Sequence, residues 1–256
     1  MQVAGTAFAS DFDGTLCHSD WKTGAEHFDP AVLDAVRRYQ AAGGLFGICT
    51  GRPLPSVRES LKGILDLDFY IVTTGAQVLD KDLRPLLERT IERELAIELY
   101  ERYTAFDEVI TVVVSESGFL SVGRELSPGI RTVPSFDQVT GKLFGISFES
   151  HTNEPLAHQV SEDVNRRYAG RVEGFQNLGS VDVVAAGCSK GAGVQVVREA
   201  LGVGCVAGAG DSYNDLPLLG AADVSYTFHS SPQEVRDAAT CVVADLAEAL
   251  EDFMAQ

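Results

Sequence analysis

The sequence lacks any apolar stretch long enough to span a membrane, and its N-terminal residues lack the basic start and apolar block of a signal peptide. It also lacks a Cys-x-x-C pair. Its 5 cysteines are scattered and odd in number, which argues against a disulfide framework and against a zinc knuckle. We interpret them as small, buried apolar residues. These absences predict a cytoplasmic protein without structural disulfides or structural zinc.

Basic residues are scarce as well. The chain of 256 residues has 20 Lys and Arg against 37 Asp and Glu, which gives a formal net charge of −17. Such a chain repels nucleic-acid phosphates and anionic lipids, so we expect it to bind neither nucleic acid nor membranes. The hydrophobic fraction of 45% and the charged fraction of 22% are those of a globular protein. The length corresponds to one large domain or two small ones.

Short apolar strands alternate with helical patterns at both ends of the chain. Strand patterns cover residues 6–12, 45–50 and 68–73 in the N-terminal third, and residues 204–209 and 223–228 near the C-terminus. Helical apolar spacing separates the N-terminal strand patterns and follows the C-terminal ones, which is typical of parallel strands joined by crossover helices. We therefore predict an α/β fold in which both ends of the chain form one doubly wound, mostly parallel sheet.

The middle of the chain follows a different pattern. Helical patterns at residues 91–103 and 155–168 accompany closely spaced strand patterns, several of them consecutive without a helix between them. Consecutive strands are typical of an antiparallel α+β module. We predict that residues 80–186 form an inserted α+β domain, and that residues 1–79 and 187–256 together form the α/β domain.

The segment Asp-Phe-Asp-Gly-Thr-Leu, which begins at Asp11, follows the first predicted strand. Ligands of open α/β sheets bind beyond the carboxyl ends of the strands, where these acids would lie. In an extended segment the side chains of Asp11 and Asp13 point to the same side, and Gly14 lets a ligand approach the backbone. Two carboxylates about 4 Å apart repel by roughly 4 kcal/mol at an effective dielectric near 20, which calls for a cation or a shared proton. A solvated turn is the alternative.

Two further segments offer groups for an anion. Thr50, Gly51 and Arg52 follow the second predicted strand and supply a hydroxyl, an amide and a guanidinium, although an ordinary helix N-cap also explains Thr50. Lys190 opens a helix predicted over residues 190–201, where a cation opposes the helix dipole by roughly 0.3–1 kcal/mol. A bound anion or a neighbouring carboxylate would compensate for this unfavourable position.

The segment Gly-Asp-Ser-Tyr-Asn-Asp follows another predicted parallel strand and contributes Asp211, Asn214 and Asp215. Together with Asp11 and Asp13, it would bring four carboxylates to one edge of the sheet. Four carboxylates repel one another strongly unless a hard divalent cation lies among them. Ligation by a few carboxylates and water suits Mg²⁺. The sequence therefore predicts a magnesium site at this edge.

These four segments, in this order, resemble the motifs of the haloacid dehalogenase-like (HAD) hydrolase superfamily, in particular its Cof-like phosphatase branch with a C2-type cap. Asp-x-Asp-Gly-Thr-Leu and Gly-Asp-x-x-Asn-Asp are the specific motifs, and Thr-Gly-Arg and Ser-Lys-Gly support them. The resemblance implies a Rossmann-like HAD core and identifies residues 80–186 as the cap. The chain departs from its relatives at Thr74-Gly75, where Asn-Gly is common, so substrate specificity does not transfer.

By that resemblance, Asp11 is the nucleophile that takes the phosphoryl group as an aspartyl-phosphate. Asp13 is the acid that protonates the leaving oxygen and then the base that activates water. Mg²⁺ is held by Asp11, by the main-chain carbonyl of Asp13 and by Asp211, and Asp215 ligates or orients.

The resemblance also implies how the phosphoryl oxygens are bound. The side chains of Thr50, Lys190 and Asn214 and the main-chain amide of Gly51 contact them. Arg52 binds substrate or pairs with an acid, and the sequence leaves both readings open.

The sequence thus predicts a Mg²⁺-dependent HAD-type phosphoric monoester hydrolase that acts on a small phosphorylated metabolite, such as a sugar phosphate. We expect a monomer or a small homo-oligomer. A phosphomutase with the same intermediate is one alternative, because it returns the phosphoryl group to a sugar. A catalytically weak protein that senses a ligand is another, although a sensor needs no second acid beside Asp11.

Overall fold

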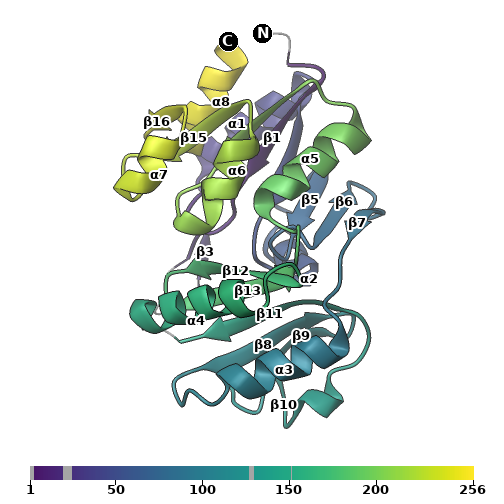
Figure 1. Ribbon diagram of the computed structural model, residues 1–256. Coiled ribbons are helices and arrows are strands. Elements are labelled where there is room, and N and C mark those ends of the chain that lie inside the picture. Colours follow the sequence, from purple (N-terminus) through teal and green to yellow (C-terminus); the bar gives the residue numbers. More distant parts are fainter. Residues whose placement is uncertain (1–2, 20–24, 127–129, 151) are drawn as a thin grey trace. The chain divides into compact units, whose positions relative to one another are not determined.

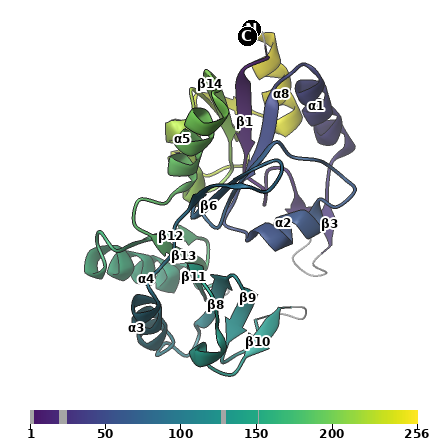
Figure 2. The ribbon, with the colours of Figure 1, turned by 90° about the vertical axis from the view of Figure 1, so that its right-hand side faces the viewer.

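The computed structural model describes residues 3–19, 25–126, 130–150 and 152–256. The chain forms two compact units (Figures 1 and 2). Met1–Leu87 and Ser189–Gln256 form the first, here called the α/β unit, and Glu88–Cys188 form the second, here called the α+β unit. These boundaries differ from the sequence-based ones at residues 80–87 and 187–188. The reason at the first boundary is that the chain adds two more strands to the large sheet before it leaves the α/β unit.

The α/β unit contains an eight-stranded sheet with the order β16-β15-β14-β1-β4-β5-β6-β7. Its strands are β1 (Thr6–Ser10), β4 (Leu45–Cys49), β5 (Phe69–Val72), β6 (Gln77–Asp80), β7 (Pro85–Glu88), β14 (Cys205–Ala209), β15 (Val224–Phe228) and β16 (Cys241–Val243). The strands from β16 to β5 pair in parallel, and β6 is antiparallel to β5. The mostly parallel, doubly wound sheet predicted from the sequence is confirmed.

Helices cover both faces of this sheet, as Figure 2 shows. They are α1 (Pro30–Ala41), α2 (Leu54–Ser60), α5 (Lys190–Leu201), α6 (Leu216–Ala221), α7 (Gln233–Ala238) and α8 (Leu246–Ala255). Alternate residues of β1 enter opposite layers: Phe8 packs with residues of α1 and α8, whereas Ala7 and Ala9 pack with residues of α5 and α6. A strand that is buried on both faces lies at the centre of a three-layer fold, so its carboxyl end is fixed.

The α+β unit contains a six-stranded sheet with the order β10-β9-β8-β11-β13-β12. Its elements are α3 (Arg93–Tyr103), β8 (Ile110–Ser115), β9 (Gly118–Val122), β10 (Arg131–Val133), the 3₁₀ turn η1 (Phe136–Gln138), β11 (Leu143–Glu149), α4 (Glu154–Arg167), β12 (Val172–Asn177) and β13 (Ser180–Ala185). Apolar residues of α3 and α4 pack in one core with alternate residues of the strands. The antiparallel α+β module is confirmed, except that β9 and β10 pair in parallel.

Short elements escaped the sequence patterns. The hairpin of β2 (His18–Ser19) and β3 (Glu26–His27), the strand β16 and the 3₁₀ turn η2 (Tyr213–Asp215) are too short to show a period. The cysteines are all unpaired, and Cys17, Cys49 and Cys188 are buried. Cys205 and Cys241, by contrast, are only half-buried, so the expectation of buried cysteines is met in three of the five positions.

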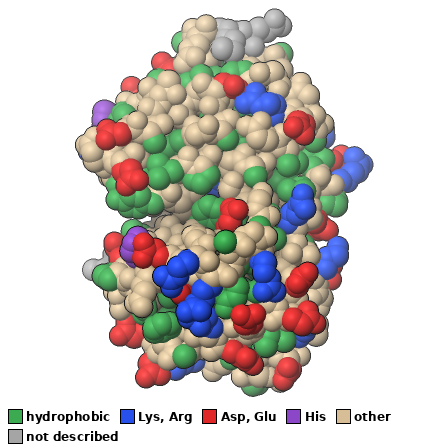
Figure 3. All heavy atoms as spheres, in the orientation of Figure 1, with side chains coloured by type: hydrophobic (Ala, Val, Ile, Leu, Met, Phe, Trp, Pro, Cys, Tyr) green, Lys and Arg blue, Asp and Glu red, His purple; other side chains and the backbone are tan. Residues whose placement is uncertain are grey.

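On the face shown in Figure 3, Lys and Arg side chains lie among Asp and Glu side chains. Among the described residues, no helix is both long enough and apolar enough to cross a membrane.

Candidate active site

Three carboxylates meet at the carboxyl edge of the large sheet. Asp11 follows β1 and Asp211 follows β14, and these strands are parallel neighbours with Ser10 opposite Ala209. One carboxylate oxygen each of Asp11, Asp211 and Asp215 lies within 4.8 Å of the other two. Asp11 is 5% exposed and Asp215 is fully buried. We call these three residues the acidic trio. Because little water reaches them, their negative charges repel one another strongly and need a positive charge nearby.

Lys190 supplies part of that charge. Its ammonium group donates a 2.6 Å hydrogen bond to Oδ1 of Asp11 and another to Oδ1 of Asp215. Lys190 is 1% exposed and opens α5, whose N-cap is Ser189. Burial lowers the pKa of Lys190, but the charges of Asp11 and Asp215 raise it by more, so the net pKa lies above the ordinary value. The sequence left two compensations open for this unfavourable helix position, a bound anion or a neighbouring carboxylate, and the structure shows two neighbouring carboxylates.

Lys190 does not neutralise all of the negative charge of the acidic trio. Burial, and then the charge of Asp215, raise the pKa of Asp11 well above its ordinary value, while Lys190 opposes the rise. Burial and Asp215 likewise raise the pKa of Asp211 to about 6. Each raised pKa means that the ionised carboxylate lacks enough favourable charge around it. The donor set of closely spaced hard oxygens therefore fits a divalent cation such as Mg²⁺.

Main-chain and side-chain donors orient two members of the trio, Asp211 and Asp215. Oδ2 of Asp215 accepts the main-chain N–H groups of Asp211 at 2.9 Å and Ser212 at 3.0 Å. Oδ1 of Asp211 accepts the hydroxyl of Thr15 at 3.0 Å. Gly14 has a φ of +83°, and a Cβ at this position would lie 2.6 Å from Oδ2 of Asp211. Glycine is therefore needed here both for the turn and for the close approach of Asp211.

Asp13 has a different environment. Its carboxylate lies outside the trio and accepts two hydrogen bonds from Arg52, from Nε at 2.8 Å and from Nη2 at 2.5 Å. Strand β1 ends at Ser10, so Asp13 lies in the turn that follows, in which the main-chain N–H of Cys17 donates to the carbonyl of Phe12 at 2.8 Å. The two acids have different cationic partners, Lys190 for Asp11 and Arg52 for Asp13. That their side chains point to the same side stays a prediction.

The other predicted phosphate-binding residues follow strands at the same edge of the sheet. Thr50 and Gly51 follow β4, which neighbours β1; Thr50 is 2% exposed, and its hydroxyl oxygen accepts the N–H of Arg52 at 3.1 Å. Asn214 is 8% exposed, and its Oδ1 has no hydrogen-bond partner within the part of the chain that the structure describes. A buried amide oxygen without a partner is uncommon and needs a hydrogen-bond donor, whereas the atom of Asn214 that can donate to an anion is Nδ2.

Sequence reasoning missed several residues at this edge. Glu26 of β3 and Ser60 of α2 both contact Arg52, but they lie outside the motifs, and nothing in the sequence singled them out. Thr73 and Thr74, after β5, both have a φ of 50°, a left-handed conformation that β-branched residues rarely adopt. Such strain is typical of functional loops. The sequence analysis singled out Thr74 and Gly75 only as a departure from the family's Asn-Gly; Gly75 has a φ of 84°.

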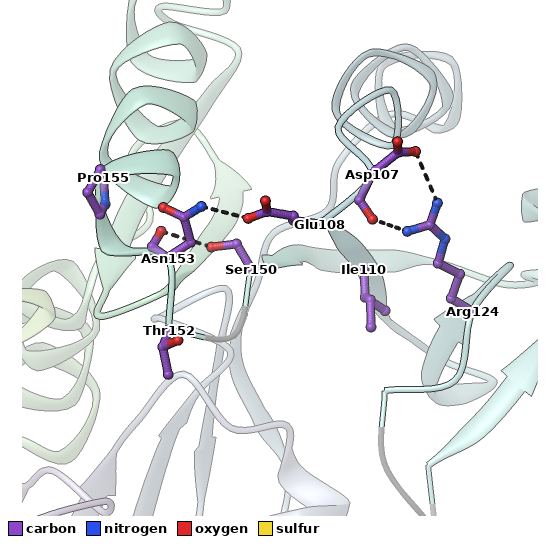
Figure 4. A pocket seen from close by; sticks show the side chains of 8 residues that line it. All are labelled: Asp107, Glu108, Ile110, Arg124, Ser150, Thr152, Asn153 and Pro155. Carbon is purple, nitrogen blue, oxygen red and sulfur yellow. Dashed lines mark hydrogen bonds and ion pairs between the residues drawn. The ribbon is translucent and has the colours of Figure 1, made fainter.

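A separate hollow of about 600 Å³ lies in the α+β unit (Figure 4). It is lined by Asp107, Glu108, Ile110, Arg124, Ser150, Thr152, Asn153 and Pro155. The polar groups shown there largely bond to one another, because Nδ2 of Asn153 donates to Glu108 at 2.6 Å and Arg124 contacts Asp107. None of the residues predicted from the motifs lines this hollow.

The raised pKa of Asp211 predicts how pH affects stability when no divalent cation is bound. The pKa rises from 3.8 to about 6 on folding, so the folded chain binds this proton more tightly than the unfolded chain. The resulting stability is complete below pH 3.8 and is lost as the pH rises through about 6. In denaturant unfolding with chelator, we expect D211N to gain stability relative to the natural chain across this window. A stability difference that stays constant with pH would contradict the assignment.

Comparison with known proteins identifies the family of this chain. A model of haloacid dehalogenase-like hydrolases matches residues 8–249. The HMP-PP phosphatase of Cronobacter sakazakii is 26% identical over 235 residues, which cover 84% of this chain and 80% of that protein.

Two solved structures share the fold. A HAD subclass IIB sugar phosphatase has a TM-score of 0.80 at 20% identity, over 97% of this chain and 98% of its own. A HAD/COF-like hydrolase from Plasmodium vivax has a TM-score of 0.82 at 18% identity, over 97% of this chain and 95% of its own. These matches confirm the resemblance read from the motifs. The chain belongs to the haloacid dehalogenase-like hydrolases.

Proposed function

We propose that this enzyme is a Mg²⁺-dependent phosphatase that hydrolyses a small phosphate monoester through an aspartyl-phosphate on Asp11. The observation that carries the proposal is the acidic trio with its buried lysine. Asp11 is held at 2.6 Å by Lys190 and lies within 4.8 Å of two further carboxylates. A site of this charge binds a divalent cation, and together with Lys190 the cation favours the approach of an anionic phosphoryl group.

The residues present fit the metal. Asp11, Asp211 and the main-chain carbonyl of Asp13 would hold Mg²⁺, which supplies charge neutralisation to the trio and to the phosphoryl group. Asp215 has a different role in this proposal. One of its oxygens accepts from Lys190 and the other accepts two main-chain N–H groups, so its lone pairs are largely used. We assign Asp215 to orienting Lys190 and the loop at Asp211.

The reaction follows from the two remaining carboxylate roles. A carboxylate oxygen of Asp11 attacks phosphorus, the bond between phosphorus and the ester oxygen breaks, and protonated Asp13 gives its proton to that oxygen. In the second half-reaction a water oxygen attacks phosphorus and gives a proton to Asp13. The bond between phosphorus and Asp11 then breaks, and inorganic phosphate leaves. Asp11 and Asp13 thus return to their starting states.

The anionic oxygens of the phosphoryl group need donors. Among the residues that the structure describes, Lys190 uses two of its three N–H groups, on Asp11 and Asp215, so one N–H is left for a phosphoryl oxygen. Thr50, Gly51 and Asn214 lie on the loops after neighbouring strands, which is where ligands of such sheets bind. We assign these four residues to phosphate binding and the α+β unit to the role of the cap.

The phosphatase names of the relatives support a small phosphorylated metabolite as substrate, and we propose a sugar phosphate or a similar ester. The test is a screen of phosphorylated metabolites that measures free phosphate with Mg²⁺ and with chelator. We expect release from at least one ester with Mg²⁺ and a loss of that release on chelation, restored by added Mg²⁺. Transfer of the phosphoryl group to another position of the sugar, without release of free phosphate, would indicate a phosphomutase. No turnover of any ester, with metal bound, would indicate a ligand sensor.

A further inference from the structure

Arg52 is held from three directions at the edge of the active site. Its Nη1 donates to Oε1 of Glu26 at 2.6 Å and to the hydroxyl of Ser60 at 3.2 Å. The Ser60 hydroxyl also donates to Glu26 at 2.9 Å, so these two side chains are hydrogen-bonded to each other and both accept from Nη1. The guanidinium carbon lies 4.4 Å from the centre of the Phe12 ring. Nε and Nη2 remain, and both donate to Asp13.

Arg52 has two kinds of partner. Glu26, Ser60 and Phe12 hold it in place, whereas Asp13 is the partner that can move. The side chain of Glu26 is 26% exposed and that of Arg52 is 21% exposed, whereas that of Asp13 is 48% exposed. When Asp13 turns toward another group, Glu26, Ser60 and Phe12 still hold the guanidinium in place. Nearly all donors of Arg52 are used within the protein, which favours pairing with an acid over substrate binding.

We propose that Glu26 is a positioning residue, which fixes Arg52 so that Arg52 holds the ionised carboxylate of Asp13 apart from the acidic trio. Asp13 turns away from Arg52 when it takes up the proton that it gives to the leaving oxygen. A bidentate guanidinium pair sets both the place and the plane of a carboxylate. Without it, Asp13 is free to approach the cation that the trio attracts, where it would be a ligand and no longer an acid. The inference rests on the proposed function, because it assigns Asp13 the proton transfer.

The test compares two phosphate esters whose leaving groups depend to different degrees on protonation by Asp13. An alkyl phosphate leaves as a strongly basic alkoxide and depends on a proton from Asp13, whereas p-nitrophenyl phosphate leaves as a weakly basic phenolate. For E26A we expect the ratio of kcat/KM for the alkyl ester to kcat/KM for the aryl ester to fall about tenfold. The inhibition constant of inorganic phosphate should stay within about twofold, because phosphate binding does not involve Glu26.

Two further variants make the result specific. E26Q retains an oxygen that accepts from Nη1, so we expect its ratio to lie between those of E26A and the natural chain, and it serves alone if E26A does not fold. E251Q is the control variant. Glu251 is an exposed residue of α8 that pairs with Arg38 of α1, so its replacement should leave the ratio unchanged. Thermal unfolding shows that each variant is folded.

Two results would overturn the inference in an enzyme that releases phosphate. One is an unchanged ratio in folded E26A and E26Q. The other is an equal loss for both esters with a weaker affinity for inorganic phosphate, which would make Arg52 and Glu26 part of the substrate-binding site. If the natural chain released no phosphate from either ester, the proposed function itself would fail, and that outcome is recognised before any variant is compared.

Discussion

Replacing Asp11 with asparagine is expected to lower phosphate release by a factor on the order of 10⁴ to 10⁶ and to leave the protein folded. Asparagine has nearly the same shape, but its amide does not attack phosphorus. Burial and the charge of Asp215 raise the pKa of Asp11, so its ionised form is unfavourable in the fold. The amide removes that charge, and Lys190 keeps Asp215 as its partner. We therefore expect a melting temperature equal to or above that of the natural chain.

Three measurements check this expectation: phosphate release with saturating Mg²⁺, thermal unfolding, and phosphate retained on acid-quenched protein. The natural chain should carry substrate-derived phosphate during turnover, and D11N should carry none. D34N is the matched control, because Asp34 is 68% exposed in α1 and pairs with another exposed side chain, that of Arg38. Turnover in D11N within about tenfold of the natural chain would rule out Asp11 as the nucleophile.

The parts of this molecule that the sequence predicts are those in which local chemistry and the fold agree. The helix predicted over residues 190–201 is α5, because Ser189 caps its start and Gly202, with a φ of 65°, ends it. The meeting of Asp11 with Asp211 follows in the same way. Parallel strands that are neighbours in a sheet bring their carboxyl ends together, so two motifs far apart in the chain share one edge.

Other parts depend on contacts that no local pattern encodes. The motif shows Asp13 two residues after Asp11, but the turn beyond Ser10 decides where its carboxylate points, and Arg52 decides what it contacts. Glu26 reaches the same guanidinium from a two-residue strand, which is too short to be recognised from its sequence. The left-handed Thr73 contradicts the preference of its own side chain, so only the folded environment explains it.

Replacing Lys190 with methionine is expected to lower the free energy of unfolding by about 3–5 kcal/mol at neutral pH and to abolish phosphate release. Methionine has a similar length, so the packing is retained and the charge is lost. Lys190 is 1% exposed, and its removal leaves the buried carboxylates of Asp11 and Asp215 without their cation. Denaturant unfolding in the presence of chelator measures the loss, since bound metal would otherwise replace part of the missing charge.

The size of this loss depends on the partners that stay behind, and a second substitution tests that directly. Adding D215N to K190M removes one of the two uncompensated charges, so the double variant should regain part of the stability, although D215N alone is destabilising. The deficit of K190M should also shrink as the pH falls, because protonated Asp11 needs no cation and its pKa is already raised by burial and by Asp215. A loss below about 1 kcal/mol that stays the same at every pH would mean that Lys190 stabilises the fold by packing alone, and that the acidic trio does not depend on its charge.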